Sequence, residues 1–173
     1  MKAIVIYNSQ TGFTKRYARW IAEAAGTECL ALADAKKENL AGYDTIVFGS
    51  WACAGGISKI NWLKANMDKW TDKKLIVFCV GASPIENPEI EAALKKNFKE
   101  SEWKRVNAFY CPGGFNYEKM SVPSKLMMKM FLKALMAKKD KTEEEQVMIK
   151  MISSSYDISD KKYIEPILRC LRQ

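Results

Sequence analysis

Residues 2–14 read KAIVIYNSQTGFT, and this stretch sets the first unit of the fold. Lys2 to Tyr7 is a short apolar run rich in β-branched residues, which predicts a strand buried on both faces. The polar loop Asn8 to Thr14 follows it. Phe13 to Ala25 then carries apolar residues at helical spacing, and Gly26 ends the predicted helix. The stretch therefore predicts a strand, a polar loop and a helix in succession.

The rest of the chain repeats this alternation. Further strands are predicted at 27–33, 45–49, 74–81 and 106–111, and helices at 36–41, 58–70, 88–99 and 159–171, the last with a kink at Pro166. Such alternation indicates right-handed βαβ units. We therefore expect one α/β domain over residues 1–173, with a doubly wound five-stranded parallel sheet in the order 2-1-3-4-5. Ligands of such sheets bind beyond the carboxyl ends of the strands, so the loops after the first, third and fourth strands form the candidate site.

The loop from Ser9 to Thr14 combines three hydroxyls with a glycine, between a strand end and a helix start. Successive backbone N–H groups in such a loop converge on an anion, the helix dipole adds to them, and the three hydroxyls donate further hydrogen bonds. The alternative is a polar turn in which a threonine caps the helix. The loop matches neither GxGxxG nor GxxxxGKS/T, which disfavours dinucleotides and nucleoside triphosphates.

At this loop the sequence resembles a known family. The pattern S/T-x-T-G-x-T is the FMN-phosphate signature of flavodoxins, and residues 9–14 match every specified position. The resemblance follows the order of elements along the whole chain and is most specific here. It implies FMN as the cofactor, with its phosphate held by Ser9, Gln10, Thr11, Gly12, Phe13 and Thr14.

Two further loops occupy the places at which flavodoxins hold the isoalloxazine ring. Trp51 stands where the family often stacks a tryptophan on one ring face, although a tryptophan in a bend is also a common core residue. The backbone from Ala52 to Gly56 is placed to present a polar group to flavin N5, and Gly55-Gly56 allow a peptide flip. The loop at 82–87 lacks the tyrosine that often covers the second face, which leaves that face open or covered by another element. The resemblance implies ring contacts from Ser50, Trp51, Ala52, Cys53, Ala54, Gly55, Gly81, Ala82 and Ser83.

The chain carries a net charge of +8, and Lys15, Arg16 and Lys59 lie near the expected site. Electron-carrying flavodoxins are strongly acidic, and their acidic surround disfavours the fully reduced, anionic flavin. We therefore expect that state to be easier to reach here. A basic surface suits polyanions, anionic lipids or acidic proteins as partners. Because the lysines are spread widely and no nucleic-acid motif occurs, we expect no nucleic-acid partner.

The sequence contains no histidine, which excludes Ser-His-Asp and Cys-His catalysis, HExxH zinc sites and histidine-ligated haem. Redox chemistry without these groups needs a cofactor, and we expect no metal site. The five cysteines form no CxxC pair, which fits buried thiols in a reducing cytosol. We expect a structural or incidental role for Cys53, the alternative being a redox thiol, for which no resolving cysteine is adjacent. We expect a cytoplasmic protein without a signal peptide or a membrane-spanning helix.

Residues 115–155 are too long for a simple connection and predict a helical insert. In the segment 122–139, VPSKLMMKMFLKALMAKK, the lysines at 125, 129 and 133 form one stripe beside a broad, Met-rich apolar surface. A second helix is expected to end near Ile152. Three interpretations remain open for the first helix: it covers the core, it walls a pocket for a flat hydrophobic substrate, or it lies on a membrane surface or docks a partner.

The insert resembles that of menaquinone-dependent protoporphyrinogen oxidases, which are flavodoxin-like and carry a basic, Met-rich helical insert at this place. The resemblance implies a porphyrinogen or a quinone as substrate and peripheral membrane association. Our leading interpretation is an FMN-dependent oxidoreductase acting on a small hydrophobic substrate, without an assigned catalytic acid or base. The alternative is a non-catalytic electron carrier that docks on a redox partner protein. A third is an interaction module that has lost the cofactor, against which the complete Ser9–Thr14 loop argues.

Overall fold

The centre of the molecule is a parallel sheet. The computed structural model describes residues 2–173, apart from the side chain of Glu144, so Met1 of the expected domain lies outside the described residues. The sheet has five parallel strands: β1 (Ala3–Tyr7), β2 (Glu28–Ala31), β3 (Thr45–Cys53), β5 (Lys74–Gly81) and β6 (Val106–Pro112). Their order is β2-β1-β3-β5-β6, so the predicted order 2-1-3-4-5 is confirmed. A short strand, β4 (Gly56–Ile57), pairs antiparallel with the end of β3.

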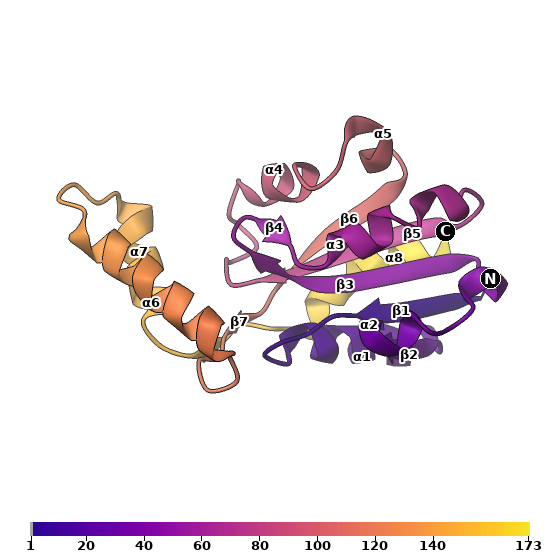
Figure 1. Cartoon of the computed structure of the whole chain (residues 1–173), viewed down its shortest axis with the longest axis horizontal. Helices are drawn as coiled ribbons and strands as arrows, with labels where there is room; N and C mark the ends of the chain where they lie inside the picture. Colours follow the sequence, from indigo (N-terminus) through magenta and orange to yellow (C-terminus); the bar gives the residue numbers. More distant parts are fainter. Residues whose placement is uncertain (1) are drawn as a thin grey trace.

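Helices cover both faces of this sheet (Figure 1). One face carries α1 (Phe13–Ala25), η3 (Lys161–Ile164) and α8 (Glu165–Arg172). The other carries α2 (Leu32–Ala35), η1 (Leu40–Gly42), α3 (Ile60–Lys64), η2 (Met67–Lys69), α4 (Ile90–Lys95) and α5 (Glu100–Trp103). The result is a three-layer arrangement in which the sheet is enclosed.

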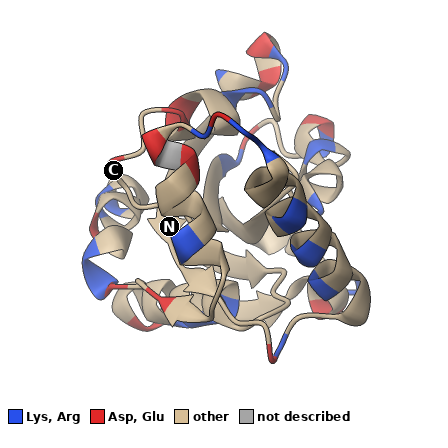
Figure 2. Cartoon of the chain, turned by 90° about the vertical axis from the view of Figure 1, so that its left-hand side faces the viewer, with Lys and Arg blue, Asp and Glu red and all other residues tan. Residues whose placement is uncertain are grey.

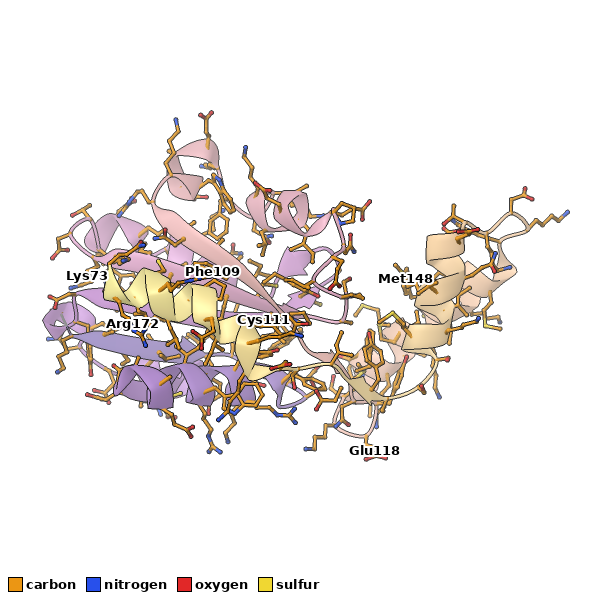
Figure 3. All side chains as sticks on the ribbon, turned by 180° about the vertical axis from the view of Figure 1, so that it is seen from behind. Lys73, Phe109, Cys111, Glu118, Met148 and Arg172 are labelled. Atoms are coloured by element: carbon orange, nitrogen blue, oxygen red, sulfur yellow. The ribbon has the colours of Figure 1, made fainter. Side chains whose placement is uncertain are left out.

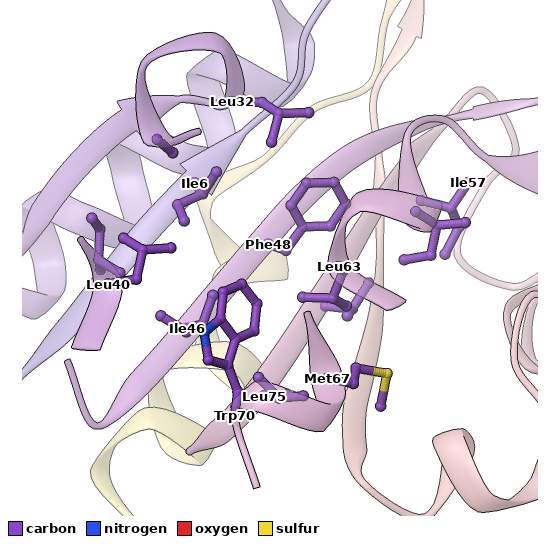
Figure 4. Packing of buried hydrophobic residues seen from close by; sticks show 14 of the residues in the cluster. Ile6, Leu32, Leu40, Ile46, Phe48, Ile57, Leu63, Met67, Trp70 and Leu75 are labelled. Atoms are coloured by element: carbon purple, nitrogen blue, oxygen red, sulfur yellow. The ribbon is translucent and has the colours of Figure 1, made fainter. Parts of the chain in front are cut away.

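Successive residues of the central strands point to opposite helical layers. In β3, Ile46 and Phe48 pack with Leu63 of α3, whereas Val47 packs with α1 and α8 on the other face. Figure 4 shows the first of these clusters, with Phe48, Leu63 and Trp70 gathered over the strands. Both faces of the central strands are therefore buried, as their continuous apolar runs predict.

The first helix begins and ends at the predicted residues. Gly12 is its N-cap with φ 102°, and Gly26 is its C-cap with φ 62°. The N–H of Gly26 donates to the carbonyls of Ala22 and Glu23, which satisfies acceptors at the helix end. Local residue chemistry was enough to delimit this element.

Three other predicted helices were wrong in extent. The segment 58–70 is two pieces, α3 and η2, because Asn66 Nδ2 donates to the Trp62 carbonyl at 2.8 Å and competes with a continued helix. The helix expected at 36–41 is replaced by α2 before it and η1 at its end, and 88–99 is shortened to α4. Pro166 lies in the first turn of α8, where its missing N–H costs nothing, so the expected kink is absent there.

The insert forms two helices that project from the body (Figure 1). We call α6 (Val122–Ala137) and α7 (Glu143–Ile152) the arm. The chain leaves the body through β7 (Gly114–Phe115) and returns through β8 (Tyr156–Asp157), which pair antiparallel. We call residues 114–121 and 155–159 the arm root. Seen from behind, Met148 lies in the arm and Glu118 in its root, whereas Cys111 marks the end of β6 in the body (Figure 3).

The arm leaves much of its apolar surface exposed. Within α6 only Leu135 is buried, because this helix packs on α7 instead of on the sheet. The interpretation that the helix covers the core is therefore wrong. Among the described residues, no helix is both long and apolar enough to cross a bilayer.

Candidate functional site

The loops that follow β1, β3 and β5 meet at the carboxyl edge of the sheet, because these strands are neighbours. The first loop runs from the end of β1 into α1. Gly12 has φ 102°, a conformation that an L side chain rarely adopts, and its N–H donates to Ser9 Oγ at 3.2 Å. No side chain caps α1, so the N–H groups of its first turn lack helical partners. Together with the helix dipole, they are a group of donors whose charge and direction suit an anion.

The side chains of this loop divide into two sets. Ser9 and Thr11 are half-buried, Thr14 is 2% exposed, and Ser9 Oγ accepts from the Gly12 N–H within the loop. Gln10 instead points outward to the arm, where its Nε2 donates to Ser121 Oγ at 3.0 Å and to Ser124 Oγ at 3.1 Å. The predicted phosphate residues therefore lie together, but the amide of Gln10 is engaged elsewhere.

The expected loop at 50–57 is a β-hairpin. β3 continues to Cys53, and Ala52 and Cys53 pair with Ile57 and Gly56 of β4. The turn between them is formed by Ala54 (φ 47°) and Gly55 (φ 76°). Two consecutive left-handed residues are what the hairpin twist requires, so the turn lies at 54–55, one residue before Gly55-Gly56, where the peptide flip is predicted.

Trp51 and Ser50 belong to the strand before this turn. Trp51 is half-buried and pairs in register with Val80 of β5. Ser50 is fully buried, and its Oγ accepts a hydrogen bond from Asn8 Nδ2 at 3.0 Å. Ser50 thus joins the end of β1 to β3 from inside the fold. Ala52, Cys53, Ala54 and Gly55 are exposed.

Sequence reasoning missed the two residues that support the hairpin from the chain segment that follows α4, Lys96 and Asn97. Asn97 Oδ1 accepts from the Ile57 N–H at 2.8 Å, and its Nδ2 donates to the Ala93 carbonyl at 2.7 Å. A Cβ built on Gly55 would lie 2.9 Å from Lys96 Nζ, so the ammonium group sits directly over the turn. Only a long-range contact brings Lys96 to this site, and no local pattern announces it.

The third loop, which begins at Gly81, is held by two tyrosine hydroxyls. Tyr110 of β6 donates to the Ser83 carbonyl at 2.9 Å, and Tyr156 of the arm root donates to the Ala82 carbonyl at 2.7 Å. Burial, followed by the neighbouring Tyr117, raises the pKa of Tyr156 to about 12, so its hydroxyl remains a donor at neutral pH. No residue of this loop offers an aromatic face, as the sequence indicates.

Two pockets differ in their position relative to the three loops. The one of about 330 Å³ lies between the first loop and the arm root, lined by Thr11, Gly12, Phe13, Arg16, Phe115 and Tyr156 among others. The other, of about 500 Å³, lies near the amino ends of β3 and β5, with Trp62, Trp70 and Lys73 in its wall. Its position at the opposite edge of the sheet separates it from the three loops.

The charge expected from Arg16 is largely compensated. Its guanidinium pairs with Asp157 and donates to Ser159 Oγ at 2.7 Å. Partial burial alone would raise the pKa of Asp157, but hydrogen bonds from Ser159 and Arg16 outweigh it and hold the pKa below its usual value. Lys15 and Lys59 are exposed. The net positive field at the site therefore rests on exposed lysines, including Lys96.

The thiols follow the expected pattern of burial. Cys79, Cys111 and Cys170 are buried, and burial raises the pKa of Cys79 to about 12. Cys29 is half-buried, and Cys53 is exposed on the hairpin. Across the described residues, no three acidic or cysteine side chains gather as metal ligands would.

Comparisons with known proteins agree with this architecture. The flavodoxin domain family model matches residues 4–144, whereas a search of curated proteins found no match. The flavodoxin, WrbA-like protein from Agrobacterium tumefaciens is 19% identical with a TM-score of 0.50, covering 88% of this chain and 95% of that one. A flavoprotein in complex with FMN from Lactobacillus acidophilus NCFM is 19% identical with a TM-score of 0.46, covering 64% and 91%. The likeness to the Agrobacterium tumefaciens protein supports the fold, and the family match extends over most of the chain. The chain therefore belongs to the flavodoxin domain family.

Proposed function

We propose that the chain binds FMN, with the phosphate held by the loop from Ser9 to Thr14. The observation that carries this proposal is the first turn of α1, where uncapped N–H groups and three hydroxyls surround a glycine in a left-handed conformation. A phosphate dianion suits such donors without a contacting lysine or arginine. Hydrogen bonds to a charged group contribute about 1.5–3 kcal/mol each, so a few of them suffice for tight binding.

The ring of the cofactor would lie against the hairpin and the third loop. Trp51 would offer its indole face, and the exposed backbone of Ala52 to Gly55 would offer polar groups to the ring. Gly81, Ala82 and Ser83 would line the other side. When bound, FMN supplies electron-transfer chemistry that the side chains themselves lack. No side chain is assigned as a catalytic acid or base.

We further propose an oxidoreductase whose substrate is flat and hydrophobic, such as a porphyrinogen or a quinone. The arm supports this, because Leu126, Met130 and Phe131 are each at least 45% exposed. Methionine-rich surfaces adapt to varied apolar ligands. The insert's resemblance to that of menaquinone-dependent protoporphyrinogen oxidases points to the same substrates, and the third loop leaves one ring face without an aromatic cover.

A second candidate is a non-catalytic electron carrier. The observation that favours it is the exposed position of the hairpin at residues 52–55, which would let a redox partner protein approach the ring edge. Rapid reoxidation of the reduced protein by a quinone, or turnover of a porphyrinogen, would support the enzyme. Slow reoxidation by a quinone and no turnover of a porphyrinogen, with rapid electron transfer to a partner protein, would support the carrier.

We propose peripheral membrane contact through residues 122–139. Figure 2 shows the lysines of α6 in a row along the helix. These are Lys125, Lys129 and Lys133, and α6 contains no acidic residue. A lysine row beside an exposed apolar surface matches the pattern of helices that lie at an anionic bilayer surface, where each lysine contributes about 1 kcal/mol.

Vesicle cosedimentation tests this contact. Replacing Lys125, Lys129 and Lys133 by glutamine should abolish binding to vesicles containing phosphatidylglycerol. The matched control replaces Lys36, Lys69 and Lys95, which are exposed on the body, and should leave binding unchanged. Equal loss in both variants would show that net charge alone, and not the arm, drives association.

The cofactor is tested by an absorbance spectrum of the purified protein and by titration with FMN. We expect flavin bands or saturable binding, and a loss of binding in Thr11→Ala combined with Thr14→Ala. Thr71→Ala, at an exposed position away from the loops, is the control. Circular dichroism checks that the buried Thr14 substitution leaves the fold intact. Absence of FMN binding by the wild-type protein would overturn both redox candidates.

A further inference from the structure

The arm root is hydrogen-bonded to two of the three loops of the candidate site. Gln10, in the middle of the phosphate loop, reaches Ser121 and Ser124 at the start of α6. Ser124 Oγ also donates back to Gln10 Oε1 at 3.3 Å. These contacts join positions more than a hundred residues apart, and both ends of the Gln10 amide are used in them.

The returning strand of the arm root makes the other connections. Tyr156 donates to the Ala82 carbonyl in the third loop, and Asp157 pairs with Arg16 just after the phosphate loop. The next residue, Ile158, donates its N–H to the Gly113 carbonyl at 2.8 Å. This short segment of the arm root therefore holds the third loop and the start of α1, whereas Gln10 ties the phosphate loop to the start of α6.

The arm root is in turn fastened to the far helix of the arm. The Tyr117 hydroxyl donates to the carbonyl of Ile152, the last residue of α7. The Tyr117 N–H donates to Ser155 Oγ at 3.0 Å. Phe115 lies between Tyr117 and Tyr156, with ring centroids 5.9 and 5.7 Å away. This aromatic cluster connects the third loop to the end of α7.

We propose that Gln10 and Tyr156 are positioning residues that couple the cofactor loops to the arm. The inference rests on the proposed function, because it needs FMN in the phosphate loop. The arm root holds both loops in place before FMN arrives, which reduces the ordering cost of binding. Because coupling between two sites is reciprocal, bound FMN must equally restrict the arm root. Cofactor loading thereby presents the exposed arm in one orientation to its substrate or surface.

The first test measures the rate of FMN release from Gln10→Ala. This variant is preferred because Ser121 also caps α6, so changing the serine alone would disturb the helix. Release should accelerate about threefold to tenfold, the size expected for losing partly exposed hydrogen bonds. Ser153→Ala, in which the lost hydroxyl bonds only to the Lys150 carbonyl, should release FMN at the wild-type rate.

A double-mutant cycle separates coupling from general loosening. Ser121→Ala with Ser124→Ala should accelerate release, and adding Gln10→Ala to that pair should produce little further change. Ser121→Thr with Ser124→Thr keeps both hydroxyls and should restore slow release. If the triple variant instead releases FMN at a rate that is the product of the two separate accelerations, Gln10 and the serines act independently. That result would overturn the assignment of Gln10 to the arm contact.

The reciprocal effect is read by hydrogen exchange. FMN should slow exchange of the segment 116–126 in the wild-type protein, and this protection should disappear in Gln10→Ala combined with Tyr156→Phe. Hydrogen exchange in α5, on the sheet face opposite to that of α1, serves as the internal reference. If the wild-type protein binds no FMN, the proposed function and the coupling both fail. If it binds FMN, but release and exchange are the same in the variants, the coupling alone is overturned.

Discussion

The body and the arm use apolar residues in opposite ways. In the body, strands such as β3 bury both faces, and Phe48 is completely enclosed. In the arm, Phe131 on α6 is 45% exposed, and its neighbours Met127 and Met130 are exposed as well. Similar side chains therefore stabilise the fold in one region and remain available to outside partners in the other. Apolar content alone does not distinguish these roles. The difference is that the strands of the body are covered by helices on both faces, whereas α6 packs on α7 instead of on the sheet.

The largest effect should come from truncating matched phenylalanines in the two regions. Phe48→Ala should lower the free energy of unfolding by about 3–5 kcal/mol, because it opens a cavity in the core. Phe131→Ala should change it by less than about 0.5 kcal/mol. Urea denaturation followed by circular dichroism measures both. A comparable cost for Phe131→Ala would mean that the arm packs on the body in solution and that the contrast is false.

Glycines give the next contrast. Gly12→Ala should cost about 1–3 kcal/mol, because alanine is strained at φ 102°, and it should weaken FMN binding. Gly42→Ala is the matched control, since a Cβ there meets open space and its φ is not in the left-handed range. Thermal unfolding and FMN titration check the pair. Unchanged FMN affinity in Gly12→Ala would separate the phosphate site from this turn.

Charges in the two regions should differ in their effect on the flavin. Lys96→Gln removes an ammonium that lies over the hairpin turn. It should lower the second reduction potential by roughly 20–40 mV, the size expected for one solvent-exposed charge near the ring. Lys129→Gln, on the exposed surface of α6, should leave the potential unchanged. A spectroelectrochemical titration in which both variants shift equally would show that net charge, and not position, sets the potential.

The smallest effect concerns the ion pair between the two regions. The pKa of Asp157 is lowered in the folded protein, so its contribution to stability is present above the usual aspartate pKa of about 3.9 and is lost as the pH falls through the lower folded value. Because both partners are 44% exposed, Asp157→Asn should cost no more than about 0.5 kcal/mol at pH 7. Urea denaturation should show that the difference shrinks below about pH 4. A difference independent of pH would contradict the pairing.

Local chemistry predicted the elements that carry their own boundaries. Gly12 and Gly26 delimit α1, which spans the predicted residues. The sheet order followed from the alternation of strands and helices. Where a side chain competed with the helix, as Asn66 does, periodicity misled the prediction.

The site was predictable only where it is continuous in sequence. The residues from Ser9 to Thr14 lie together as expected, but the turn at Ala54 and Gly55 lacks the usual Asn-Gly signal of a hairpin. The supports from Lys96, Asn97 and Tyr156 come from distant segments. Such contacts depend on tertiary packing, which no local pattern encodes.

The antiparallel pairing of β7 with β8 lets the body accommodate the arm as an insertion between two adjacent positions. The chain exits and re-enters the body at paired positions, with Phe115 opposite Tyr156. The distance between Phe115 and Tyr156 therefore stays the same whatever length of chain joins them. The entropic cost of closing that loop grows only slowly with its length. Sequence drift, insertion or exchange in the arm is thus decoupled from folding of the sheet. A domain built in this way can change the sequence or length of its arm while the strands and helices of the body keep their packing.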